Sequence, residues 1–141
     1  MRGLKRYFSL LLMLEMIVLS PVAMADSPLS PFLWKHRVLL VNAPDSHSKM
    51  QARLEAAEEY VAERDVVWFV LNSDDYASNL DVSVPGTFSD DLKRKYFPKG
   101  KYHVVLVGKD GGVKRRSEAL DLAELFGLID SMPMRRREMG E

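Results

Sequence analysis

Residues 104–116 predict two strands joined by a tight turn. They read Val104-Val105-Leu106-Val107-Gly108-Lys109-Asp110-Gly111-Gly112-Val113-Lys114-Arg115-Arg116. The apolar run that ends at Val107 is typical of a strand covered on both faces, and we expect a strand over residues 103–107. Asp110-Gly111 favours a type I′ turn, because that turn needs a positive φ at both central positions. We therefore expect residues 113–116 to return as an antiparallel strand. The charges on this second strand suit the edge of a sheet, where lysine and arginine discourage further pairing.

The preceding residues predict a strand, a helix and a second strand in succession. Apolar runs at residues 38–41 and 66–71 are typical of buried strands, and apolar residues recur at helical spacing over residues 48–61. Ser48-x-x-Gln51 resembles a capping box that begins this helix. Since a strand, helix, strand unit crosses over with a right hand, the two strands are expected to be parallel neighbours in one sheet.

Two further helices are expected, one before the hairpin and one after it. Ser89 can cap the first helix, which follows a long loop over residues 72–87. The second helix runs from Asp121 to Met132, and Pro133 ends it because the residue before a proline disfavours helical backbone.

This succession of elements, βαβ-α-ββ-α, predicts an α/β domain. It folds most simply as a mixed four-stranded sheet in which the second strand, the first, the third and the fourth lie side by side, with helices on both faces. That arrangement is the thioredoxin-like architecture.

The N-terminal residues have the three regions of a secretory signal peptide. Basic residues precede an apolar run, and Val22-Ala23-Met24-Ala25 provides small residues at the spacing of a cleavage site. Glu15 and Pro21 interrupt the apolar run, whereas a membrane span needs about 20 apolar residues.

We therefore expect three segments and an exported protein. Residues 1–25 are the signal peptide, residues 26–34 a spacer and residues 35–141 a single domain. The expected location is periplasmic or extracellular, with no stable membrane insertion after the signal peptide has been cleaved.

Two sequence motifs near the C-terminus are similar to those of a known family. They are Gly108-Lys109-Asp110-Gly111-Gly112-Val113-Lys114 and Met132-Pro133-Met134-Arg135-Arg136-Arg137-Glu138-Met139, and Arg37 and Arg64-Asp65 are similar to the opening of that family. The chain resembles an uncharacterised domain family of bacterial exported proteins that also occurs in animal secreted proteins with sushi repeats, sometimes called DUDES. The resemblance implies a thioredoxin-like or peroxiredoxin-like fold with no established activity, so no catalytic residue is carried over.

The chain has no cysteine, which excludes disulfides and thiol chemistry. In a thioredoxin-like domain the reactive Cys-x-x-Cys follows the first strand, where this chain has Pro44-Asp45-Ser46-His47-Ser48. Thiol–disulfide exchange needs a thiolate as the attacking group, and neither serine nor histidine replaces it. The protein is therefore not a thiol oxidoreductase or a thiol peroxidase.

The loop from Pro44 to Ser48 is also the site of an alternative hypothesis, an envelope enzyme of unknown reaction. Ser46 or Ser48 would be the nucleophile and His47 the base, oriented by Asp45 or Asp74. Neighbouring side chains at the start of a helix point apart, and backbone capping already explains Ser48. We therefore favour capping and loop chemistry over catalysis.

The three histidines do not predict a metal site. We expect His36 and His103 near one end of the sheet and His47 near the other, and the chain has no His-x-x-x-His pattern and no calcium-binding loop. We therefore expect neither a bound metal nor a cofactor.

Charge is segregated along the chain, although the formal net charge is +0. Residues 44–92 contain 3 basic and 11 acidic residues, whereas residues 93–116 contain 9 basic and 1 acidic residue. The overall balance argues against a nucleic-acid binder, while the basic segment suits an anionic partner.

The basic hairpin and the C-terminal arginines are the candidate interaction surface. Its expected members are Lys109, Lys114, Arg115, Arg116, Arg135, Arg136 and Arg137. The leading hypothesis is therefore an exported, redox-inert binding module, rather than an enzyme, whose partner is an unidentified protein or an anionic envelope component.

Overall fold

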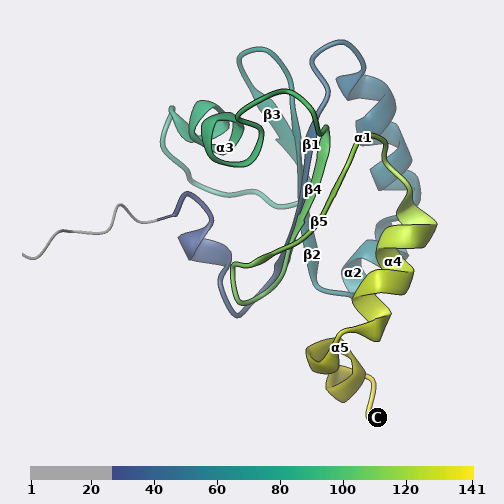
Figure 1. Ribbon diagram of the computed structural model, residues 1–141. Coiled ribbons are helices and arrows are strands. Elements are labelled where there is room, and N and C mark those ends of the chain that lie inside the picture. The colour runs from purple at the N-terminus through teal and green to yellow at the C-terminus, as the bar shows by residue number, and fades with distance from the viewer. Residues whose placement is uncertain (1–26) are drawn as a thin grey trace, which may run out of the picture.

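The computed structural model describes residues 27–141 and shows a five-stranded mixed sheet with helices on both faces (Figure 1). The strands are β1 (Arg37–Asn42), β2 (Val66–Leu71), β3 (Tyr76–Ser78), β4 (Val104–Val107) and β5 (Val113–Ser117). A short 3-10 helix, η1 (Ser30–Phe32), precedes them, and the helices are α1 (His47–Ala56), α2 (Glu58–Glu63), α3 (Phe88–Tyr96), α4 (Leu122–Ser131) and α5 (Pro133–Glu138). The predicted signal peptide, residues 1–25, lies outside the described residues.

The centre of the sheet is the parallel pair β1 and β2, flanked by β4 on one side in the order β3-β2-β1-β4-β5. Every residue of β2 and all but the last residue of β1 are buried, as expected of strands covered on both faces. One apolar core lies between the sheet and η1 with α3, and the other lies between the sheet and α1, α2 and α4 (Figure 1). Alternate residues along each central strand therefore supply opposite cores.

The mixed α/β class is confirmed, but the predicted number of strands is wrong because β3 adds a fifth. β3 lies within residues 72–87, which were expected to form a loop, and pairs antiparallel with β2. Tyr76 packs edge-on against Phe69, with ring centroids 5.5 Å apart. Beyond the strand, Asn79 accepts a hydrogen bond from the Trp68 N–H at 2.9 Å and donates one to the Val66 carbonyl at 3.0 Å. An amide side chain thus continues the pairing of a strand too short to show a periodic pattern.

The helix expected over residues 48–61 is two helices, because the backbone leaves helical geometry at Ala57. The predicted capping box is also wrong. Ser46 is the N-cap residue of α1, and the Gln51 amide donates to Glu55 at 2.8 Å rather than to the helix start.

The expected ends of the later helices are only partly correct. Ser89 does not cap α3, which begins at Phe88; its buried hydroxyl instead donates to the Asp75 carbonyl at 3.5 Å. Asp121 caps α4 by accepting the Glu124 N–H at 3.0 Å, as expected of this position. Pro133 ends α4 and is also the first residue of α5.

The reversal between β4 and β5 differs from the expected type I′ turn. The Gly111 N–H donates to the Gly108 carbonyl at 3.0 Å, so Lys109 and Asp110 are the central residues of the turn. Gly111 follows with φ of 82°, whereas Asp110 is not among the residues with positive φ. This is the longer hairpin loop in which a left-handed glycine follows the turn.

Part of the segment expected to be a spacer packs against the body of the domain. Leu29 and Phe32 are buried, and the Phe32 ring packs edge-on against Phe69 with centroids 5.4 Å apart. The Trp34 N–H donates to the Lys109 carbonyl at 2.7 Å, which joins this segment to the hairpin. None of the helices in residues 27–141 is long and apolar enough to cross a bilayer.

Replacing Gly111 by alanine should destabilise the protein by about 1–2 kcal/mol, because a Cβ is strained in the left-handed region. That Cβ would also lie 2.8 Å from a methyl carbon of Leu33. Gly127, an exposed position inside α4 with open space around it, is the matched control. The Gly127→Ala variant should be more stable than the wild type by about 0.5–1 kcal/mol. Urea unfolding of the two variants tests this, and equal effects would contradict it.

Candidate functional site

The two arginines of β5 lie on opposite faces of the sheet. Arg115 pairs in register with Leu106 and Arg116 with Val105, and neighbouring residues of a strand point to opposite sides. Arg115 forms an ion pair with Glu124 of α4. Arg116 lies on the side of α3, so the sequence-predicted surface is divided between two faces.

A cluster of ion pairs occupies the end of the sheet where β1 begins. Arg37 is 1% exposed, and its two terminal nitrogens lie 3.2 and 3.3 Å from the carboxylate oxygens of Glu138. One of these nitrogens also donates to the Arg64 carbonyl at 2.8 Å. The first residue of β1 is therefore tied both to α5 and to the segment before β2.

Lys109, at the end of β4, joins the same carboxylate. Its ammonium lies 2.7 Å from Glu138 and 2.9 Å from Asp65, and only 9% of its side chain is exposed. Asp65 has φ of 51°, a left-handed conformation that Asp adopts more readily than most residues. The turn before β2 thus presents a carboxylate to the β4–β5 hairpin.

Arg64 and Arg135 complete the cluster around Asp130. Arg64 donates two hydrogen bonds to the Asp130 carboxylate at 2.9 and 2.7 Å, and its guanidinium lies 4.8 Å from the centre of the Phe126 ring. Arg135, which is 5% exposed, lies 3.3 Å from Asp130 and 3.0 Å from the Glu63 carboxylate.

These side chains form what we term the ionic cluster, in which four cations face four carboxylates. Its members are Arg37, Arg64, Lys109, Arg135, Glu63, Asp65, Asp130 and Glu138. Because their charges are satisfied within the chain, Lys109 and Arg135 are parts of the scaffold. Replacing either of them would test stability, not recognition.

The remaining predicted residues are mostly paired as well. Lys114 lies 2.9 Å from Asp110, and the hydrogen bond from Lys114 holds the pKa of Asp110 below its usual value. Arg136 pairs with Glu141 at 3.1 Å. Arg137 donates to the Pro133 carbonyl at 3.3 Å and lines a hollow of about 360 Å³ that Lys109 and Lys114 also line.

A different group of cations lies around Arg116. Arg116 lines a hollow of about 160 Å³ together with Lys95, Lys99 and Lys101, and we term this site the basic hollow. Within the described residues, none of these four side chains forms an ion pair with a carboxylate, in contrast to the members of the ionic cluster.

The basic hollow is built by the end of α3 and the loop that follows it. Basic residues in the last turn of α3 are favoured by the helix dipole, and Gly100, with φ of 62°, turns the chain toward β4. The Lys95 ammonium lies 5.5 Å from the centre of the Tyr96 ring, and that of Lys101 lies 5.3 Å from the centre of the Tyr102 ring. The excess of basic residues over residues 93–116 includes this group. The candidate interaction surface expected from the sequence nevertheless left out Lys95, Lys99 and Lys101.

The loop that follows β1 lines another hollow, also of about 360 Å³. Asp45 and Ser46 line it together with His103, whereas His47 does not. Because β4 runs antiparallel to β1, the Asn42 N–H donates to the His103 carbonyl at 2.8 Å. His103 therefore lies at this end of the sheet, which corrects its expected place near His36. In residues 27–141, no three acidic or histidine side chains are grouped to hold a metal ion.

One family model matches the chain over residues 28–138, and its description is a domain of unknown function, DUF4174. No curated protein matches the chain, and no solved structure matches it.

Replacing Glu138 by glutamine should destabilise the protein by about 2 kcal/mol, because the buried Arg37 loses its counter-charge. Glu141→Gln is the control, since its partner Arg136 is exposed and such a surface pair contributes at most about 1 kcal/mol. Urea unfolding at pH 7 measures both. Equal stability of the two variants would show that the ionic cluster does not hold α5 to the body.

Stability should fall as the pH drops below about 4, because the cluster's carboxylates become protonated. A hydrogen bond from Arg64 lowers the pKa of Asp130 below 3.8. Burial raises the pKa of Glu138, but hydrogen bonds from Lys109 and Arg37 outweigh it and leave the pKa below 4.5. A lowered pKa in the folded state contributes stability that is present above the unfolded pKa and is lost as the pH falls through the folded one.

The difference in stability between the wild type and the Glu138→Gln variant should therefore shrink between pH 5 and pH 3. Unfolding curves across this range test the sign, and a difference that stays constant would contradict it.

Proposed function

The chain belongs to the DUF4174 family, whose description assigns no activity, and from this premise we propose that the protein is a redox-inert binding module that takes an anionic partner in the basic hollow. The partner class is that of an unidentified protein or an anionic envelope component. Nucleic acid is not the expected partner, because the chain as a whole has a formal net charge of +0.

The observation that carries the proposal is a group of four basic side chains around one hollow for which the described residues provide no paired carboxylate. In contrast, the cations of the ionic cluster and Arg115 each face a carboxylate. Across the residues that the structure describes, Lys95, Lys99, Lys101 and Arg116 gather around one hollow and no carboxylate is paired with them. Their mutual repulsion is relieved when an anion binds, and such a local field also speeds the approach of an anionic partner.

The dimensions of the basic hollow support recognition of an anionic group on a larger partner. Its volume of about 160 Å³ is below the range of about 300–1,000 Å³ usual for small-molecule sites. Arg116 can engage a carboxylate, sulfate or phosphate through two parallel hydrogen bonds, while the lysines act as point charges. An acidic group that projects from a protein or polymer therefore suits the hollow better than a whole metabolite.

We also propose that the domain is thioredoxin-like and exported, in a periplasm or the extracellular space. The order β2-β1-β4-β5 within the sheet, with helices on both faces, supports the first proposal, and β3 is then an addition at one edge. The three-part signal pattern of residues 1–25 supports the second. Neither proposal implies thiol chemistry, because the chain has no cysteine.

The double variant Lys99→Glu/Lys101→Glu should elute from a resin of sulfated polysaccharide at a clearly lower NaCl concentration than the wild type. NaCl elutes the protein by screening the attraction between its basic side chains and the sulfate groups of the resin. A variant in which two of these side chains are replaced by glutamate is held more weakly, so less salt is needed to elute it. Lys35→Glu/Lys49→Glu is the matched control, because it makes the same change in net charge at exposed lysines outside the basic hollow.

Near-wild-type elution of the control supports the proposal. Equal elution of the two double variants would mean that retention follows net charge alone, which would overturn it.

A further inference from the structure

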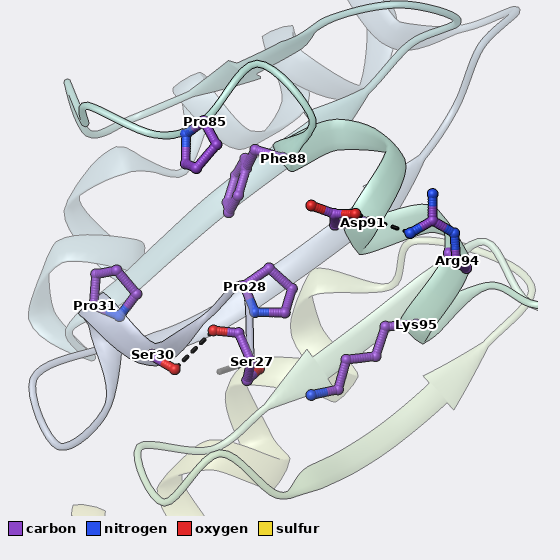
Figure 2. A pocket seen from close by; sticks show the side chains of 9 residues that line it. All are labelled: Ser27, Pro28, Ser30, Pro31, Pro85, Phe88, Asp91, Arg94 and Lys95. Atoms are coloured by element: carbon purple, nitrogen blue, oxygen red, sulfur yellow. Dashed lines mark hydrogen bonds and ion pairs between the residues drawn. The ribbon is translucent and has the colours of Figure 1, made fainter. Parts of the chain in front are cut away.

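Another hollow, of about 610 Å³, lies between η1 and α3 and adjoins the basic hollow (Figure 2). We term it the apolar hollow, and it is lined by Ser27, Pro28, Ser30, Pro31, Pro85, Phe88, Asp91, Arg94 and Lys95. Figure 2 shows three prolines around the ring of Phe88. Its volume is in the range of about 300–1,000 Å³ typical of sites that enclose a small molecule.

The walls of the apolar hollow are stiff and mostly apolar. Each proline has a fixed φ and no backbone N–H, so these segments are stiff and offer few donors. Phe88 is 2% exposed and is held in place by edge-on packing against Phe69 and Tyr76. The hollow is therefore preformed, which reduces the entropy lost when a ligand binds.

Among the described residues at the rim, one cation has no paired carboxylate. Asp91 and Arg94 form an ion pair at 3.0 Å and neutralise each other. Lys95 extends from α3 toward Ser27 (Figure 2), and in the described part of the chain no carboxylate pairs with it. Lys95 lines both hollows, so the apolar walls and the group of cations meet at its ammonium.

We propose that the apolar hollow binds a small anionic amphiphile, with its hydrocarbon part against Phe88 and the prolines and a single carboxylate head group at Lys95. This inference rests on the proposed function and names the chemical class of one ligand of that surface. A neutral apolar molecule would leave Lys95 without a counter-charge, whereas a small hydrophilic anion would leave the apolar walls in contact with water. A fatty carboxylate satisfies both parts of the site.

The experiment uses isothermal titration of the full-length chain with decanoate, decanol and acetate at concentrations where decanoate is monomeric. Decanoate should bind saturably with one site per chain. Decanol should bind roughly tenfold more weakly because it lacks the charge-assisted hydrogen bond, and acetate should show no saturable binding because it lacks the hydrocarbon chain.

Two variants and one control locate the binding. Lys95→Gln should weaken decanoate roughly tenfold and leave decanol unchanged, since only the head group loses a partner. Pro85→Glu, which places a charge in the apolar wall, should abolish the binding of both. Pro44→Glu introduces the same charge at another exposed proline, outside both hollows, and should bind decanoate as the wild type does.

The outcomes separate this inference from the proposed function. If decanoate fails to bind, or binds equally to the Pro85→Glu and Pro44→Glu variants, the amphiphile site is overturned. In that case, salt-sensitive retention on the sulfated resin that still depends on Lys99 and Lys101 leaves the anion-binding proposal standing. Loss of decanoate binding only in Pro85→Glu, with tenfold weakening in Lys95→Gln, supports the site.

Discussion

The buried guanidinium of Arg37 is the point at which most of the chain is tied together. A charged group that is removed from water needs a counter-charge and satisfied hydrogen bonds, and Arg37 obtains both from Glu138 and the Arg64 carbonyl. Glu138 is then shared with Lys109, so β1, the segment before β2, the β4–β5 hairpin and α5 meet in one network. Asp130 extends the network to α4. Tertiary contacts of this kind can hold α5, which has six residues and is too short to be stable alone.

The ionic cluster joins arginines and acidic residues that come from separate parts of the sequence. Arg37, Arg64-Asp65, Asp130 and the C-terminal Arg135 and Glu138 are far apart in the chain but belong to one set of ion pairs. Their chemistry is that of a scaffold. At the other end of β4, around the end of α3, four basic side chains line the basic hollow, and within the described residues none of them pairs with a carboxylate.

Helix α3 connects the two hollows. Its first turn buries Phe88 under the apolar hollow, and its last turn carries Lys95 into both. The helix is held against the sheet by Leu92 and Tyr96 and by the edge-to-face packing of the rings of Phe88, Phe69 and Tyr76. The edge strand β3 supplies Tyr76, which packs against Phe88 at the floor of the apolar hollow.

The sequence by itself determined the α/β class, the four longer strands, the Asp121 cap, the helix stop at Pro133 and the lack of thiol chemistry. All of these follow from local patterns: apolar runs, capping residues and composition. It could not determine β3, since three residues show no period and their pairing depends on Asn79 and on aromatic packing. The sequence also could not separate the cations of the ionic cluster from those that line the basic hollow. Only the tertiary structure decided that Arg135 is buried against Glu63 and Asp130 while Arg116 joins three lysines, because an ion pair between distant residues depends on which chain segments the sheet brings together.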